Sequence, residues 1–285
     1  MKNLIISFIA ILNICFLFSL EIPVPKYVHS ITCSDINLDN YIDIIIGSSQ
    51  SSSPNDSITA LINNGLGEFN KISFEKNNMH TLKCAKIDDD NLPDLVTKVF
   101  DSYDIVYYSN NGDLTFEEGS IIHSTLSNHN ETIKIADMDN DGDNDVVFRN
   151  HGVNFDSYIG ISINNGYGNF ADNIIYTTTD GSITNLSIGK INNDELEDIL
   201  AARLFGAQLF YNNFPLFEEV IIDTFPATHS YIDDMDNNGY NDLVLFAHNF
   251  ILEIPCYMKI LYNCGDDTFI EGNTLNFPCG TYIQI

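Results

Sequence analysis

The sequence has no tryptophan, only 12 Lys and Arg residues against 40 Asp and Glu residues, and six cysteines. The formal net charge of −28 argues against partners that require basic patches, such as nucleic acid and anionic membranes. The few cysteines do not form a disulfide framework, and the odd number beyond residue 20 leaves at least one free thiol. The catalytic motifs G-x-S-x-G and H-E-x-x-H and a Gly-rich phosphate loop are also missing. We therefore expect a protein that is not an enzyme.

Long hydrophobic runs are equally scarce, and only the N-terminus carries one. Lys2 precedes a mostly apolar run from Leu4 to Leu20. This pattern predicts a secretory signal peptide at residues 1–20, cleaved after Ser19 or Leu20. An uncleaved anchor is the alternative, because the run approaches the length that spans a bilayer. We expect the chain beyond it, residues 21–285, to be secreted or at the cell surface, with no membrane insertion after cleavage.

One acidic motif recurs five times, and its last aspartates are spaced by 51, 51, 53 and 44 residues. The copies are SDINLDNYIDIII from Ser34, AKIDDDNLPDLVT from Ala85, ADMDNDGDNDVVF from Ala136, GKINNDELEDILA from Gly189 and DDMDNNGYNDLVL from Asp233. Each copy is followed by Asn-Asn-Gly or a variant of it and then by Phe, as in INNGYGNF from Ile163. Asn and Gly readily adopt the positive φ angles of tight hairpins. Each repeat therefore contains an acidic loop followed by a hairpin.

The spacing of these signatures predicts four short strands in each repeat, with no helical periodicity between them. Four antiparallel strands in a period of about 50 residues are typical of a propeller blade. We therefore predict an all-β fold, a β-propeller of four-stranded antiparallel blades with five recognisable repeats. The C-terminal FPCGTYIQI from Phe277 is similar to FPATHSYID from Phe225. The ring is therefore either latched by a C-terminal strand or truncated from a longer propeller.

The third acidic loop has aspartates at every second position, at Asp137, Asp139, Asp141, Asp143 and Asp145. So many neighbouring carboxylates repel one another unless a cation lies between them. Hard oxygen donors in a tight loop suit Ca²⁺, whereas zinc would require His or Cys. An EF-hand is excluded, because its twelfth position needs a bidentate Glu and Phe148 stands there. The sequence thus predicts a calcium loop flanked by strands.

These loops resemble FG-GAP (VCBS-type) repeats, the calcium-bearing blades of the integrin alpha-subunit propeller. The resemblance extends from Ser30 to Phe269, and it implies ligands at loop positions one, three, five and nine, with a backbone carbonyl at position seven. The implied calcium ligands are Asp137, Asp139, Asp141, Asp143 and Asp145 in the third loop, Asp234, Asp236, Asn238, Tyr240 and Asp242 in the fifth, and Asp35, Asn37, Asp39 and Asp43 in the first. In the first loop Asn40 replaces the usual glycine, and Asn tolerates the left-handed conformation.

The second and fourth loops depart from this pattern, because Lys86 and Lys190 stand at position one. An ammonium group can take the place of the cation and neutralise the carboxylates internally. We therefore expect three calcium sites and two loops filled by lysine.

Calcium that joins two strands stabilises the folded chain by mass action, so we expect its role to be structural. We predict a binding or adhesion module for an extracellular protein or glycan. A carbohydrate-active enzyme or lectin that uses the channel face is the alternative, because fold does not choose function. In the family, partners bind opposite the calcium loops, which corresponds here to residues 48–57, 100–103, 150–158, 204–207 and 248–255. Aromatic residues in these loops either contact a ligand or wedge between blades. The sequence does not predict the oligomeric state.

Overall fold

The computed structural model describes residues 3–8, 18–23, 28–48, 57–75, 79–99, 102–124, 132–151, 157–171, 174–177, 183–224, 226–247 and 256–277. Within these ranges every regular element is a β-strand, and every pairing for which a register is given is antiparallel. Contacts divide the chain into two compact units, residues 1–85 with 91–119 and residues 86–90 with 120–285.

The N-terminal strands form a separate two-stranded sheet in which β1 (Asn3–Phe8) pairs with β2 (Phe18–Pro23). These strands cover much of the predicted signal peptide, whose cleavage stays a prediction. Among the described residues no helix is long and apolar enough to span a membrane.

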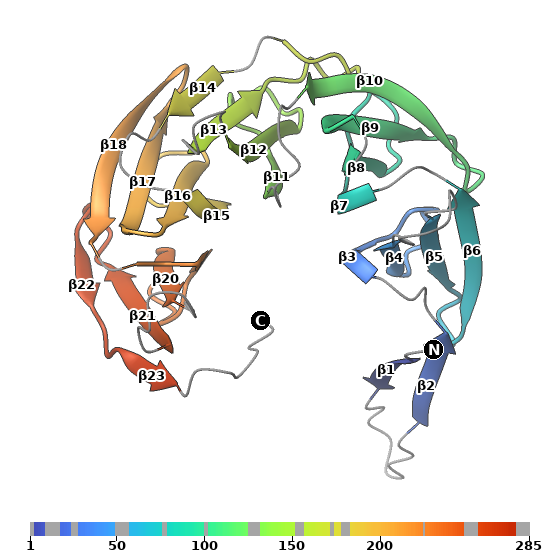
Figure 1. The fold of residues 1–285 in the computed structure, drawn as a ribbon, viewed down its shortest axis with the longest axis horizontal. Coiled ribbons are helices and arrows are strands. Elements are labelled where there is room, and N and C mark those ends of the chain that lie inside the picture. Colours follow the sequence, from blue (N-terminus) through green and yellow to red (C-terminus); the bar gives the residue numbers. More distant parts are fainter. Residues whose placement is uncertain are drawn as a thin grey trace. The chain divides into compact units, whose positions relative to one another are not determined.

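The first two blades are four-stranded sheets in which each strand pairs with the next in the sequence (Figure 1). The first blade contains β3 (Val28–Ser34), β4 (Asp43–Ser48), β5 (Ser57–Asn63) and β6 (Phe69–Glu75). The second contains β7 (Met79–Ala85), β8 (Asp94–Val99), β9 (Asp104–Asn110) and β10 (Phe116–Ser124). Ile58, Leu82 and Val106 belong to the apolar core that these strands enclose.

The other three blades repeat this order of strands, as the green to red arrows of Figure 1 show. The third contains β11 (Ile133–Ala136), β12 (Asp145–His151), β13 (Ser157–Ser162) and β14 (Ile174–Thr177). The fourth contains β15 (Ile183–Gly189), β16 (Asp198–Arg203), β17 (Gly206–Asn213) and β18 (Leu216–Asp223). The fifth contains β19 (His229–Asp233), β20 (Asp242–Ala247), β21 (Cys256–Asn263), β22 (Phe269–Glu271) and β23 (Leu275–Phe277).

The second strand of each blade is its most buried element. All six residues of β16 and of β20 are buried. β-Branched and apolar residues on both faces suit a strand that is covered on both sides. The acidic loop thus lies between a half-buried first strand and a fully buried second strand, which fixes the position of its last aspartate.

The last described strands complete the fifth blade, because β22 and β23 both pair with β21. The segment that resembles the first strand of another blade begins at Phe277, and the rest of it lies outside the described residues. The prediction of an all-β propeller with four-stranded antiparallel blades is confirmed.

Candidate functional site

The aspartate at position nine of each acidic loop is fully buried. These residues are Asp43, Asp94, Asp145, Asp198 and Asp242, each with 0% exposure. In the third loop its carboxylate accepts hydrogen bonds from the backbone N–H groups of Met138 (2.8 Å) and Asn164 (2.8 Å). Both bonds recur in the first, fourth and fifth loops. Position nine therefore ties the acidic loop to the hairpin of its own blade, whether or not the loop can hold a cation.

The first asparagine of the hairpin then connects this blade to the one before it. Asn164 is 1% exposed, and its Nδ2 donates to the carbonyls of Asn144 (3.1 Å) and Ile87 (2.7 Å). Ile87 is at position two of the preceding acidic loop. Asn110, Asn212 and Asn263 make the same pair of bonds. This link between blades was not predicted from the sequence, where the asparagine was interpreted only as a turn residue, although its recurrence in all five repeats was the signal.

Loops one, three and five share a second arrangement, built around the aspartate at position one. Asp137 accepts the N–H groups of Asp141 (3.1 Å) and Gly142 (2.9 Å), one on each carboxylate oxygen. Asp35 and Asp234 do the same in their own loops. The chain turns tightly there through positive φ at positions four and six, at Leu38, Asn40, Asn140, Gly142, Asn237 and Gly239.

The expected tolerance of the glycine replacement is confirmed, because Asn40 has a φ of 69°. Residues 86–94 and 190–198 are all described, and none of them has a positive φ. The loops that have lysine at position one therefore follow a different backbone path. Position one therefore distinguishes the two kinds of loop, although no difference in backbone path was predicted from it.

Three loops gather carboxylates closely enough to share one cation. The groups whose oxygens lie within 4.8 Å of one another among the described residues are Asp88, Asp90 and Asp94; Asp137, Asp139 and Asp145; and Asp234, Asp236 and Asp242. An all-oxygen donor set of this kind suits Ca²⁺. The first loop has an amide, Asn37, at position three. It therefore lacks the third carboxylate that completes the groups of the third and fifth loops.

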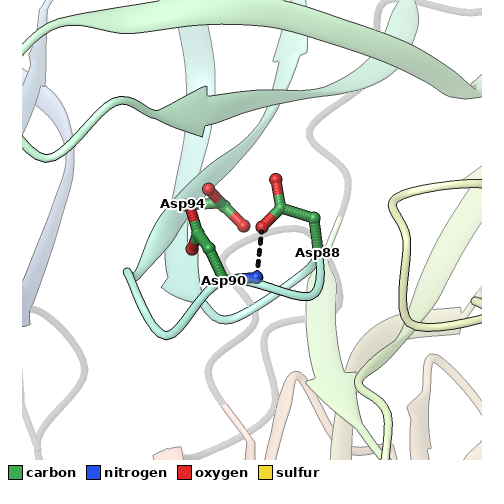
Figure 2. Close-up of side chains that lie close together, drawn as sticks. All are labelled: Asp88, Asp90 and Asp94. Atoms are coloured by element: carbon green, nitrogen blue, oxygen red, sulfur yellow. Dashed lines mark hydrogen bonds between the residues drawn. The ribbon is translucent and has the colours of Figure 1, made fainter.

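The second loop was expected to be filled by its lysine, and the structure shows a different arrangement. Figure 2 shows the carboxylates of Asp88, Asp90 and Asp94 converging above the loop, where the Asp90 N–H also donates to Asp88 (3.2 Å). Lys86 is exposed. In the fourth loop the Lys190 ammonium pairs with Glu195 (2.8 Å), and the two side chains are 44% and 85% exposed. Lys190 therefore pairs with an exposed glutamate of the loop rather than with its buried aspartate.

In the third loop, burial and neighbouring charges disfavour the charged forms of Asp145 and Asp139 when no cation is bound. Burial raises the pKa of Asp145 to about 7, against the opposing effect of hydrogen bonds from Asn164 and Met138, and the charges of Asp139 and Asp141 add to the rise. The pKa of Asp139 is also raised, by burial and then by Asp141. A bound divalent cation would reverse this preference, because it stabilises the ionised form of its ligands.

In the third and fifth loops the side chain at position five closes the turn and is not part of the close carboxylate group, whereas Asp90 of the second loop is. Asp141 accepts the N–H of Asp143 through Oδ1 (2.9 Å), and Asn238 accepts that of Tyr240 (2.8 Å). Asp39 does the same in the first loop.

The side chain at position seven lies over the hairpin of the same blade. A Cβ on Gly166 would lie 2.3 Å from the Asp143 carboxylate, and one on Gly265 would lie 2.4 Å from the Tyr240 ring. Both glycines also have positive φ. These contacts direct the side chains of Asp143 and Tyr240 toward the hairpin, so only their backbone carbonyls stay predicted ligands.

The predicted partner loops lie largely outside the described residues, except for 204–207 and parts of three others. Phe205 is 64% exposed in the turn between β16 and β17. Tyr158 accepts a hydrogen bond from Asn150 (2.6 Å), and Tyr103 lies 5.9 Å from the Lys98 ammonium. Of these three aromatic residues, Phe205 is the one available to a partner.

Comparison with known protein families agrees with the predicted character of these loops. Residues 86–148, which contain the second and third acidic loops, match the family described as FG-GAP-like repeat. This segment is similar to FG-GAP-like repeats. The predicted resemblance is therefore confirmed over residues 86–148, and this segment includes two of the three loops in which carboxylates converge.

Solved structures agree on the fold. The chain is similar to the crystal structure of AofleA from Arthrobotrys oligospora, with 9% identity and a TM-score of 0.58 over 94% of this chain and 78% of that one. A triple arginine-to-alanine mutant of AofleA gives 9% identity and a TM-score of 0.56 over 93% and 79%. At this identity the likeness shows the fold alone. The search of curated proteins gives no significant sequence match.

Proposed function

We propose that this chain is an exported, calcium-binding β-propeller that acts as a binding or adhesion module for an extracellular protein or glycan. Calcium is structural in this proposal. The observation that carries it is the geometry of the third and fifth loops. There a close group of three carboxylates coincides with a backbone turn held by the position-one aspartate.

The structural role follows from where these loops lie. Each connects the first strand of a blade to its buried second strand, and its position-nine aspartate contacts the hairpin of the same blade. A cation there stabilises the corner of a blade, because it binds the folded loop more tightly than the unfolded chain. The opposite ends of the strands carry the partner loops, where exposed Phe205 lies.

Binding of the partner is tested by screening the purified protein against glycan and extracellular-protein arrays, with calcium and with a chelator. We expect one class of ligand to be retained when calcium is present. Circular dichroism under both conditions separates a structural from a direct role. Loss of binding together with loss of folded signal supports structural calcium, whereas loss of binding by a fully folded protein contradicts it. Turnover of a polysaccharide would overturn the proposal that the protein is not an enzyme.

Export is tested separately, by expressing the full chain in a secretory host. We expect the protein in the medium with a new N-terminus at residue 20 or 21, which N-terminal sequencing reads directly. Retention in the membrane fraction with Met1 intact would contradict cleavage and favour the anchor.

A further inference from the structure

One feature that calcium binding does not explain is a pocket of about 350 Å³ beside the fourth acidic loop. Its lining comes from that loop, from β17 and β18, and from the hairpin of the fifth blade, all within the second compact unit. The lining residues are Asn192, Tyr211, Asn213, Glu218, Val220, Ile222 and Asp267. The pocket is large enough for a side chain or a small ligand.

The lining combines exposed carboxylates with half-buried apolar side chains. Glu218 and Asp267 are exposed, whereas Val220 and Ile222 of β18 are half-buried. None of the lining residues is cationic, and the nearby Lys190 pairs with Glu195. The pocket therefore presents carboxylates to a ligand without a basic group of its own.

The electrostatic environment of the buried tyrosine agrees with this description. Tyr211 is 9% exposed. Burial raises the pKa of Tyr211 to about 12, and the charges of Asp267, Asp198 and Glu218 contribute to the rise. The same negative field that disfavours a phenolate favours a cation in the pocket. An aromatic ring at the wall adds a further attraction for a cationic group.

We propose that this pocket binds the side chain of a lysine or arginine from a basic protein partner. The alkyl stem packs along Val220 and Ile222, and the charged head lies between Glu218 and Asp267. Long basic side chains combine an apolar stem with a charged end, which matches the apolar residues and the carboxylates of this lining. The site is distinct from the partner loops of the proposed function, which lie at the other ends of the strands.

A small-molecule titration tests the charge and shape of the site. The probe is 1,5-diaminopentane, and 1,5-pentanediol serves as the uncharged control of the same length. Calorimetry or NMR in excess calcium keeps the acidic loops filled. We expect about millimolar affinity for the diamine, none measurable for the diol, and weaker binding as salt is raised toward 1 M, where the Debye length falls to about 3 Å.

Two variants locate the binding in the pocket. E218Q and D267N should each weaken diamine binding by about two- to fivefold, the size expected for one exposed charge pair. E117Q is the matched control, because Glu117 is also exposed and also follows the hairpin phenylalanine, in the second blade. It should change the affinity by less than about twofold. All three sites are exposed, so the variants should fold.

The outcomes are distinct. Equal weakening by E117Q, or affinity that is unchanged in E218Q and D267N, would overturn the proposal. So would binding of a neutral monosaccharide in place of the diamine, or displacement of the diamine by calcium. Failure of the acidic loops to bind calcium contradicts the proposed function but leaves the response of E218Q and D267N as a separate result.

Discussion

At the scale of single residues, the buried asparagine that starts the hairpin links the second, third, fourth and fifth blades to the blade before. In the third blade the backbone N–H of Asn164 donates to Asp145, and its side-chain amide donates to the carbonyls of Ile87 and Asn144. Removing such a group leaves buried acceptors without their donors, and this costs more than the bond itself contributes.

We therefore expect Asn164→Ala to lower the free energy of unfolding by about 2–3 kcal/mol, because one buried and one part-buried carbonyl lose their donor. Urea denaturation measures this change. Asn165→Ala is the control, since Asn165 is exposed and its side chain only accepts a turn bond from Tyr167. Its cost should stay below about 1 kcal/mol. Equal costs at the two positions would contradict the role of Asn164 as a link between blades.

Substitution of two aspartates in the same loop should have different effects on calcium affinity. Asp139 belongs to the close carboxylate group, whereas the side chain of Asp143 lies against the hairpin. Asp139→Asn removes one charge from the group and should weaken calcium binding at that loop about tenfold or more. Asp143→Asn should change it by less than about threefold. Calorimetric titration of both variants measures the effect, and the reverse ranking would contradict the proposed ligands.

The metal-free protein should lose stability as the pH rises. Burial raises the pKa of Asp145 to about 7 and that of Asp198 to about 6, from the ordinary value of 3.8. Between these limits the folded chain binds more protons than the unfolded chain, so the free energy of unfolding falls with increasing pH. Their contribution is complete below pH ~4 and is lost as the pH passes through ~6 and ~7.

Chemical denaturation in chelator at pH 5 and at pH 7.5 measures this trend. Asp198→Asn keeps the shape of a loop that has no close group of three carboxylates. This substitution should reduce the change in the free energy of unfolding with pH by about 1.4 kcal/mol for each pKa unit that it removes. Greater stability of the metal-free wild type at pH 7.5 than at pH 5 would contradict the assignment.

At the scale of elements, glycines in the strands make room for aromatic rings. Gly160 of β13 stands opposite Phe148 of β12, and a Cβ on it would lie 2.1 Å from the Phe148 ring. Phe148 is fully buried, so the ring has no space into which it could move. At Gly47 of β4 the nearest atoms would be 3.8 Å away, an ordinary contact distance.

Gly160→Ala should therefore cost about 1–3 kcal/mol through overpacking, whereas Gly47→Ala should be neutral or stabilise by up to about 1 kcal/mol. Thermal denaturation of both variants tests the difference. Partial rescue of Gly160→Ala by Phe148→Leu would identify the ring as the cause. A larger loss at Gly47 would contradict the packing.

The sequence predicted the elements better than it predicted the contacts between them. Asp or Lys at position one separated the two kinds of loop, because the aspartate side chain accepts the N–H groups of positions five and six. The hairpins followed from their Asn and Gly residues. Two contacts were out of reach: the direction of the Asp143 side chain and the pairing of Lys190 with Glu195. Both depend on rotamers that are chosen only after the loop and its neighbours are packed.

At the scale of the whole molecule, the prediction of repeated four-stranded blades succeeded because two independent signatures kept the same register through five repeats. The repeat did not predict which loops bring three carboxylates close together. The third and fifth loops have both the close carboxylate group and the turn held by position one, while the first and second loops have one of these features each. The fourth has neither among its described residues, 190–198.

This ranking predicts how many calcium ions bind and how tightly, and calorimetric titration of the metal-stripped full chain measures both. We predict two tight sites and at most two weaker ones. Exactly the two tight sites should disappear when Asp139→Asn and Asp236→Asn are combined. No binding, five equivalent sites, or an unchanged number of tight sites in that double variant would contradict the account.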